Sequence, residues 1–162
     1  MEPTREVLDL LLDDARASTE DIARQTGLEE GAVADAIAAL EEQGVVRGYQ
    51  AIVDWEALDE EHVRAEVELN VTLDRETGYD DIADRLARFP EVYSLELVSG
   101  EYDFLMVVEG ESMNEVSRFI SEKVAPVPEI TQTVTHYVME TYKDRGVEFG
   151  DGDEDDRLSV SP

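Results

Sequence analysis

A short turn after an apolar alternating segment carries the residue types best suited to binding a small ligand. The turn contains Gly100, Tyr102 and Asp103, and the threonines Thr133 and Thr135 share one face of a later segment. Backbone N–H groups of a turn can bind a carboxylate, and an aspartate or a threonine hydroxyl can bind an ammonium group. The residues alone favour a plain β-turn, in which glycine supplies a positive φ and aspartate caps. For the threonines, simple β propensity is an equal alternative.

Metal and catalytic chemistry have little support in the sequence. The two histidines, His62 and His136, lie in different predicted strands without metal-ligand spacing, so we expect structural roles for both. The acidic run at 151–156 lacks the spaced ligands of a calcium loop and is typical of a solvated tail. There is no cysteine, and no nucleophile–base pair or phosphate loop is present. We therefore expect no metal, no cofactor and no enzymatic activity.

The charge of the chain is strongly one-sided. Its 162 residues include 41 Asp and Glu against 13 Lys and Arg, a net charge of −28. Because the acids are spread along the whole chain, we expect a halophilic protein whose self-repulsion is screened by molar salt. An acidic protein with a cationic partner is the alternative, although a binding patch would concentrate the acids. Without an apolar run of membrane-spanning length or a leader pattern, we expect a cytoplasmic protein with no membrane partner.

Three helical patterns are predicted in the first 43 residues. The first spans Thr4 to about Asp14, with Thr4 as its N-cap and an apolar stripe of Val7, Leu8, Leu11 and Leu12. The second begins at Ser18, with Asp21 completing a capping-box-like pair, and ends at Gly27. The third runs from about Glu29 to Gln43 and has Val33, Ile37 and Leu40 on its inner face. Residues 45–53 are predicted to form extended chain or a short wing, and residues 54–61 an acidic hinge.

The second half of the sequence predicts strands and helices in the order β-α-β-β-α-β, the ferredoxin-like pattern. The predicted elements are strand 63–73, helix 79–89, strands 92–99 and 104–109, a helix capped by Ser112, and strand 130–139. In the last strand, Ile130, Gln132, Val134, His136 and Val138 are predicted on one face and the threonines on the other. The chain thus divides into an N-terminal domain at 1–50, a linker at 51–61, a second domain at 62–145 and an acidic disordered tail at 146–162.

The whole layout resembles the Lrp/AsnC (feast/famine) regulators, as found in haloarchaea, over about residues 4–145. Two stretches carry the resemblance: residues 40–49 (LEEQGVVRGY), and residues 99–103 (SGEYD) followed by a threonine-rich strand. It implies an α+β protein with a winged helix-turn-helix before a ferredoxin-like ligand-sensing and dimerisation domain. It also implies promoter DNA as a partner, and homodimers formed through the sheets that can assemble into tetramers or octamers. An amino acid or similar effector would bind near Gly100, Tyr102, Asp103, Thr133 and Thr135.

The candidate DNA-contacting residues depart from what such a domain usually presents. The candidates are Thr19, Gln25, Thr26, Glu29, Ala32, Ala34, Asp35, Arg47 and Gln50. Cations normally offset phosphate charge, but residues 1–50 contain four arginines and twelve acids. DNA binding would then rest on shape, alanine methyl groups and a few polar side chains in concentrated salt. The alternative is an interaction protein that senses a metabolite without binding DNA and modulates a paralogous regulator by forming mixed oligomers.

Overall fold

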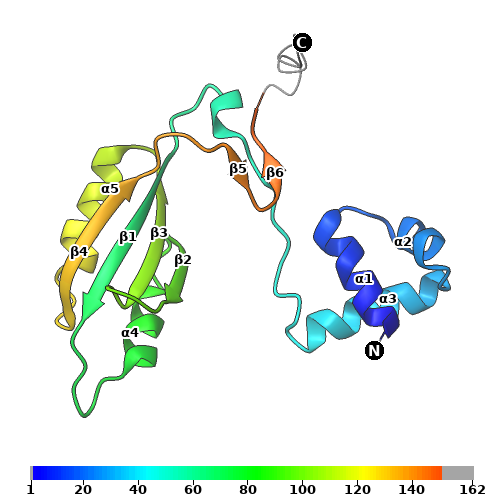
Figure 1. Cartoon of the computed structure of the whole chain (residues 1–162), viewed down its shortest axis with the longest axis horizontal. Helices are drawn as coiled ribbons and strands as arrows, with labels where there is room; N and C mark the ends of the chain where they lie inside the picture. Colours follow the sequence, from blue (N-terminus) through cyan, green and yellow to red (C-terminus); the bar gives the residue numbers. More distant parts are fainter. Residues whose placement is uncertain (1, 151–162) are drawn as a thin grey trace, which may run out of the picture. The chain divides into compact units, whose positions relative to one another are not determined.

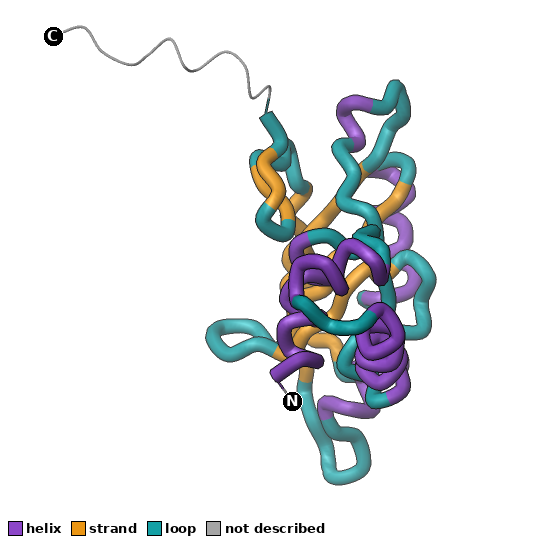
Figure 2. Tube along the Cα trace, turned by 90° about the vertical axis from the view of Figure 1, so that its right-hand side faces the viewer, coloured by secondary structure: helices purple, strands orange, loops and turns teal. Residues whose placement is uncertain are grey.

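The computed structural model describes residues 2–150 and divides into two compact units, with the boundary between Ala51 and Ile52. Helices occur in both units, whereas all of the strands lie in the second (Figures 1 and 2). The predicted α+β class is thereby confirmed. No helix in the described part of the chain is long and apolar enough to cross a membrane.

The first unit consists of three helices that pack against one another (Figure 1). They are α1 (Glu2–Asp13), α2 (Thr19–Thr26) and α3 (Glu30–Glu42), and the core consists of Val7, Leu11, Ile22 and Val33. Two details of the predicted first helix are wrong. It begins before Thr4, which is therefore not the N-cap, and Leu12 is 72% exposed because it lies beyond the edge of the stripe that faces α2 and α3.

Local chemistry sets the ends of α2 as the sequence predicts. The Ser18 hydroxyl accepts a hydrogen bond from the Asp21 backbone N–H at 3.0 Å and donates one to the Asp21 carboxylate at 2.8 Å. At the other end Gly27 adopts φ +75°, a conformation that glycine takes at little cost. These two ends fix the length of α2 and the tight turn that leads into α3.

Residues 43–62, which cross the boundary between the units, contain no strand. After α3, the backbone N–H groups of Val45 and Val46 both donate to the Leu40 carbonyl, and the Tyr49 hydroxyl donates to Glu41 at 2.9 Å. A short 3-10 helix follows at Trp55–Ala57. Of the two predicted forms of residues 45–53, the structure therefore has the extended chain.

The second unit is a four-stranded antiparallel sheet with helices on one face. Its elements are β1 (Val63–Val71), α4 (Tyr79–Leu86), β2 (Val92–Leu97), β3 (Phe104–Gly110), α5 (Met113–Phe119), which continues as a π-helical turn at Ile120–Val124, and β4 (Ile130–Tyr137). The strand order is β2-β3-β1-β4, so the first and last strands of the β-α-β-β-α-β unit are neighbours. This is the predicted ferredoxin-like topology.

Alternation along the strands separates a core face from an open face. Ala65, Val67 and Leu69 of β1 are fully buried and pack with the buried residues of both α4 and α5. In register with them on β3 are Val108, Met106 and Phe104. The intervening residues of each strand point to the other face, which no helix among the described residues covers.

The faces of β4 differ in one respect from the prediction. A register shift at Thr131 pairs Ile130 with Val71, so Ile130 packs on the core with Tyr137 instead of sharing a face with Gln132. Thr133 and Thr135 pair with Leu69 and Val67 and therefore lie on the core side. An extra residue in one strand moves the side chains that precede it to the opposite face of the sheet. The sequence pattern does not reveal such a shift.

A small hairpin follows β4 and corrects the predicted start of the acidic tail. β5 (Lys143–Asp144) pairs with β6 (Val147–Glu148), and the Phe149 backbone N–H donates to the Tyr142 carbonyl at 2.8 Å. Residues 146–149 are therefore ordered by backbone pairing and are not tail. The remainder of the predicted tail, residues 151–162, lies outside the described residues.

Candidate DNA-binding surface and effector site

The outer surface of α3 presents only methyl groups and carboxylates. Val33 and Leu40 are buried on its inner side. The exposed residues are Glu30, Gly31, Ala32, Ala34, Asp35, Ala38, Glu41 and Glu42. None of these side chains can donate a hydrogen bond at neutral pH, and none carries a positive charge. The exposed side chains of this helix therefore lack not only the cation that the sequence analysis found missing but also any hydrogen-bond donor.

Two of the predicted DNA-contacting threonines are engaged within the fold. The Thr19 hydroxyl donates to the Glu30 carboxylate at 2.8 Å, which joins the first turns of α2 and α3. The Thr26 hydroxyl donates to the Ile22 carbonyl at 2.8 Å and accepts from the Leu28 backbone N–H at 3.3 Å. These hydroxyls hold the turn between the helices. The predicted candidates Gln25, Glu29 and Gln50 are exposed.

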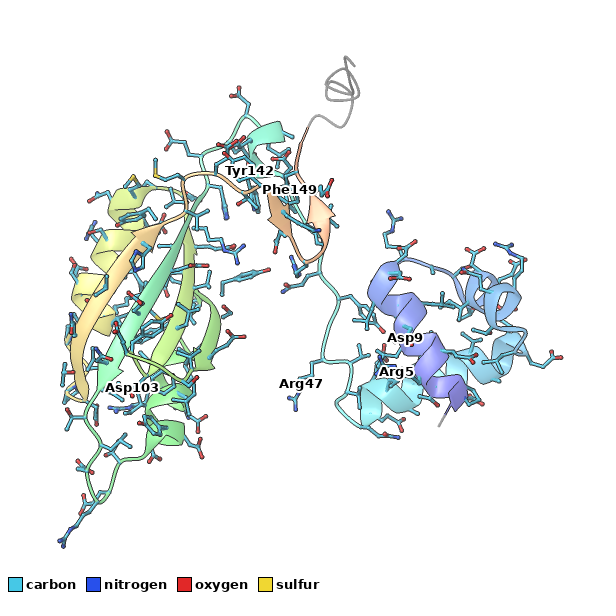
Figure 3. The ribbon with its side chains drawn as sticks, in the orientation of Figure 1. Arg5, Asp9, Arg47, Asp103, Tyr142 and Phe149 are labelled. Carbon is cyan, nitrogen blue, oxygen red and sulfur yellow. The ribbon has the colours of Figure 1, made fainter. Side chains whose placement is uncertain are left out.

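Few cations of the first unit are available for phosphate. Arg5 pairs with Asp9 at 2.9 Å, and Arg24 pairs with Asp21 at 2.6 Å. Hydrogen bonds from Ser18 and Arg24 hold the pKa of Asp21 below its ordinary value. Arg47 is exposed, forms no ion pair within the described structure and projects from the chain that follows α3 (Figure 3).

Asp103 holds the turn at residues 98–103 by three hydrogen bonds, two with the end of β1 and one with Tyr79 of α4. Its backbone N–H donates to the Leu69 carbonyl, and its Oδ2 accepts from the Val71 N–H, both at 2.9 Å. The Tyr79 hydroxyl reaches Oδ1 at 3.3 Å. Gly100 has φ +122°, so the left-handed conformation predicted for this turn is present. The Asp103 carboxylate thus has a structural role in the single chain.

The predicted effector threonines lie at the same end of the sheet as this turn. Phe104, which follows the turn, and Thr133 flank Leu69 on opposite sides. Thr133 and Thr135 are half-buried beside the core, while Thr131 is exposed and donates to the Asn70 carbonyl at 3.2 Å. β1 therefore separates the threonines from the turn, and the two groups do not touch across one cavity in a single chain.

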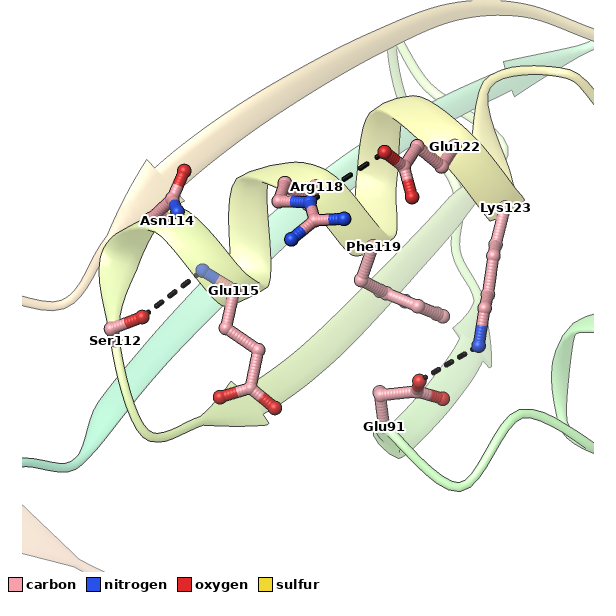
Figure 4. A pocket seen from close by; sticks show the side chains of 8 residues that line it. All are labelled: Glu91, Ser112, Asn114, Glu115, Arg118, Phe119, Glu122 and Lys123. Carbon is pink, nitrogen blue, oxygen red and sulfur yellow. Dashed lines mark hydrogen bonds and ion pairs between the residues drawn. The ribbon is translucent and has the colours of Figure 1, made fainter.

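A shallow pocket of about 240 Å³ lies elsewhere, along α5 (Figure 4). It is lined by Glu91, Ser112, Asn114, Glu115, Arg118, Phe119, Glu122 and Lys123, and none of these is a predicted effector residue. Its cations are already paired, Lys123 with Glu91 at 3.1 Å and Arg118 with Glu122 at 3.6 Å. Burial opposes ionisation of Glu91, but hydrogen bonds from its own backbone and from Lys123 leave its pKa lowered. The pocket therefore offers no unpaired cation to a ligand.

The histidines make separate local contacts. The His62 ring stacks on Trp55, with ring centroids 4.0 Å apart, and the His136 Nε2 lies 2.8 Å from a carboxylate oxygen of Glu68. No group of three or more potential metal ligands occurs in the part of the chain that the structure describes.

Helix-turn-helix geometry before a ferredoxin-like sheet defines a class of two-domain regulators, and comparison with known families agrees. Residues 2–47 match a family described as winged helix-turn-helix DNA-binding, and residues 64–148 match the Lrp/AsnC ligand binding domain. The chain belongs to the Lrp/AsnC family. It is a DNA-binding transcriptional regulator and not an enzyme.

Relatives and solved structures extend this similarity over almost the whole chain. An uncharacterized HTH-type transcriptional regulator, YugG of Bacillus subtilis, is 39% identical over 99% of this chain and 98% of its own length. The leucine response regulatory protein LrpA of Mycobacterium tuberculosis is 26% identical, with a TM-score of 0.75 over 91% of this chain and 98% of that one. The regulator NMB0573 of Neisseria meningitidis, solved with L-Met, shares the fold at 20% identity, with a TM-score of 0.71 over 89% and 92% of the two chains.

Proposed function

We propose that this regulator binds promoter DNA as a homodimer in a cytoplasm of molar salt and responds to an amino acid or a related metabolite. The observation that carries the proposal is the surface of α3, on which every charged residue is acidic although the domain is a DNA-binding one. At 0.1 M salt the Debye length is about 10 Å, and carboxylates near phosphates repel. At 1 M it is about 3 Å, and the repulsion is largely screened.

The same charge pattern supports a halophilic, and specifically a haloarchaeal, origin. A net charge of −28 over 162 residues keeps a protein soluble in concentrated salt and destabilises it in dilute salt. Only 2 of the 13 cations are lysines, Lys123 and Lys143.

We propose that some of the exposed candidates contact phosphates and that others face base edges. Arg47, Gln25 and Gln50 would contact phosphates, and Ala32 and Asp35 would face base edges together with Ala34 and Glu29. Thr19 and Thr26 would act through the fold, because their hydroxyls hold the α2–α3 turn.

The proposed effector site is the turn that carries Gly100, Tyr102 and Asp103, with Thr133 and Thr135 near the same end of the sheet. The family name of residues 64–148 as a ligand-binding domain and the L-Met complex of the Neisseria relative support a small amino acid. Because Asp103 already accepts two hydrogen bonds through its side chain, its proposed role is to hold the turn, whose backbone amides would bind the effector carboxylate.

A thermal-shift screen against the twenty amino acids in 2 M KCl tests the effector site. A ligand at a hundred times its Kd stabilises the protein by about 2.7 kcal/mol, a shift that such a screen resolves. Tyr102→Ala should abolish the shift, while Tyr142→Ala in the hairpin, as a matched control, should keep it. If none of the twenty amino acids stabilises the protein, the turn is not an amino-acid site.

We propose that dimers form through the open face of the sheet. Leu105 and Val134 present apolar surface there, with Glu68 of β1 between them and the exposed Glu66 beside it, whereas Val107 on the same face is buried. Such a face, apolar with acidic neighbours, suits pairing with a second copy in screened salt. Further assembly into tetramers or octamers is part of the same proposal.

Chromatin immunoprecipitation from cells at their native salt tests DNA binding by the whole chain. We expect discrete promoter peaks, reduced by Arg47→Ala and kept by Arg5→Ala, because Arg5 is already paired with Asp9.

The donor-free surface of α3 also favours a second candidate, a metabolite-sensing partner that lacks DNA binding and modulates a paralogous regulator. Peaks that vanish when a paralogue is deleted, together with mixed oligomers, would favour that candidate.

A further inference from the structure

We propose that the side chains of α3 read DNA only through thymine methyl groups and base amino groups, and form no hydrogen bond to guanine N7 or O6. This inference rests on the proposed DNA-binding function and adds the chemistry of the bases read. It follows from the composition of the helix, since residues Glu30–Glu42 consist only of Glu, Gly, Ala, Val, Asp, Ile and Leu. No side chain along the whole of α3 can donate a hydrogen bond at neutral pH.

The major groove offers a limited set of partners to such a helix. Guanine presents two acceptors there, N7 and O6, and both need a donor from the protein. A carboxylate can only accept, so its partners are the amino groups of cytosine N4 and adenine N6. An alanine methyl group packs against the C5-methyl of thymine. Complementary partners for α3 are therefore thymine methyl groups and base amino groups.

Three residues on the outer side of α3 are placed for this task. Ala32, Asp35 and Ala38 are spaced three apart, so they form one exposed row away from the buried Val33 and Leu40. The Asp35 carboxylate makes no hydrogen bond or ion pair with another described residue, whereas the Glu30 carboxylate is held by Thr19. Asp35 is thus the free acceptor at the middle of the helix, between two methyl groups.

Selection from a random 20-bp duplex library by the full chain in 2 M KCl supplies the probe for the test. The enriched duplex is then resynthesised with uracil in place of thymine, or with 7-deazaguanine in place of guanine. Uracil should weaken binding about fourfold for each contacted methyl, the equivalent of about 0.8 kcal/mol. The 7-deazaguanine duplex, which lacks only the N7 acceptor, should bind within about twofold of the parent.

A substitution of Asp35 gives a second test, in which the enriched base is measured. Asp35→Asn adds a donor beside an acceptor, the pair that matches adenine N6 and N7, so it should shift the enriched base to adenine at one position in each half-site. Glu6→Gln, at an exposed position of α1, makes the same charge change outside α3 and should leave the enriched sequence unchanged. An equal loss with 7-deazaguanine, or no loss with uracil, would overturn the inference while leaving DNA binding intact. No enrichment at any salt would overturn the proposed function itself.

Discussion

The Thr19 hydroxyl and the Glu30 carboxylate are joined by a 2.8 Å hydrogen bond between the first turns of α2 and α3. It keeps one of the few hydroxyl groups of this surface inside the fold. Thr19→Val should lower the stability of the N-terminal unit by about 0.5–1.5 kcal/mol, since a hydrogen bond is lost without a change of shape. Urea unfolding followed by the helical circular dichroism signal measures this. Thr4→Val on α1, where no side-chain hydrogen bond is present, is the matched control and should change stability by less.

The capping pair of α2 predicts a dependence of stability on acid. The pKa of Asp21 lies below its ordinary value of 3.8 in the folded chain because Ser18 and Arg24 donate hydrogen bonds to it. Its contribution is therefore present above the unfolded pKa, and is lost as the pH falls through the lower folded pKa.

Ser18→Ala should remove part of this dependence and cost about 1 kcal/mol through loss of the cap. Thermal melts between pH 2.5 and pH 7 in constant KCl should show the gap between the variant and the parent narrowing at low pH. A constant gap between them at every pH would contradict the assignment.

Removal of the Asp103 carboxylate should destabilise the second unit locally. Asp103→Ala leaves the Val71 N–H and the Tyr79 hydroxyl without their acceptor, which should cost about 1–3 kcal/mol. Asp103→Asn keeps an acceptor oxygen and should cost clearly less. Amide hydrogen exchange provides the direct measurement, with faster exchange expected at Val71 in the alanine variant. Unchanged protection at Val71 would contradict the role given to this carboxylate.

These residues also show what the sequence can predict. Ser18, Asp21 and Gly27 act within one helix and its ends, so their types and spacing suffice to predict the cap and the stop. The partner of Asp103 is 32 residues away at Val71, and only the sheet brings the two together. The register shift at Thr131 and the two-residue strands β5 and β6 leave no hydrophobic period to detect. Long-range pairing therefore decided the details that the sequence analysis missed.

If dimers form through the open face of the sheet, a single substitution on that face should weaken the dimer. Val134 is 37% exposed on this face, and Val134→Asp would place two carboxylates at a twofold interface. Burying unpaired carboxylates costs several kcal/mol through lost hydration, which salt does not screen, so the dimer Kd should rise by at least about a hundredfold. Sedimentation equilibrium in 2 M KCl measures it. Met113→Asp, at a 55% exposed position of α5, is the control and should leave the dimer intact.

Arg47 should contribute to the salt response of DNA binding, because it is exposed and forms no ion pair within the described structure. Arg47→Ala should weaken binding to all sequences similarly and remove roughly one phosphate contact from the slope of log affinity against log salt. Fluorescence anisotropy with two unrelated duplexes checks both effects. A loss confined to one duplex would instead make Arg47 a reader of base edges.

The KCl dependence of DNA affinity for the whole chain tests the central claim most directly. A cationic DNA-binding protein loses affinity steadily as salt rises. With twelve acids against four arginines in residues 1–50, this regulator should gain affinity between 0.1 M and about 1 M KCl, and retain it at 2–3 M. Anisotropy titrations with its selected duplex across this range give the answer. Binding that is tightest at 0.1 M and falls throughout, or is absent at every KCl concentration, would contradict it.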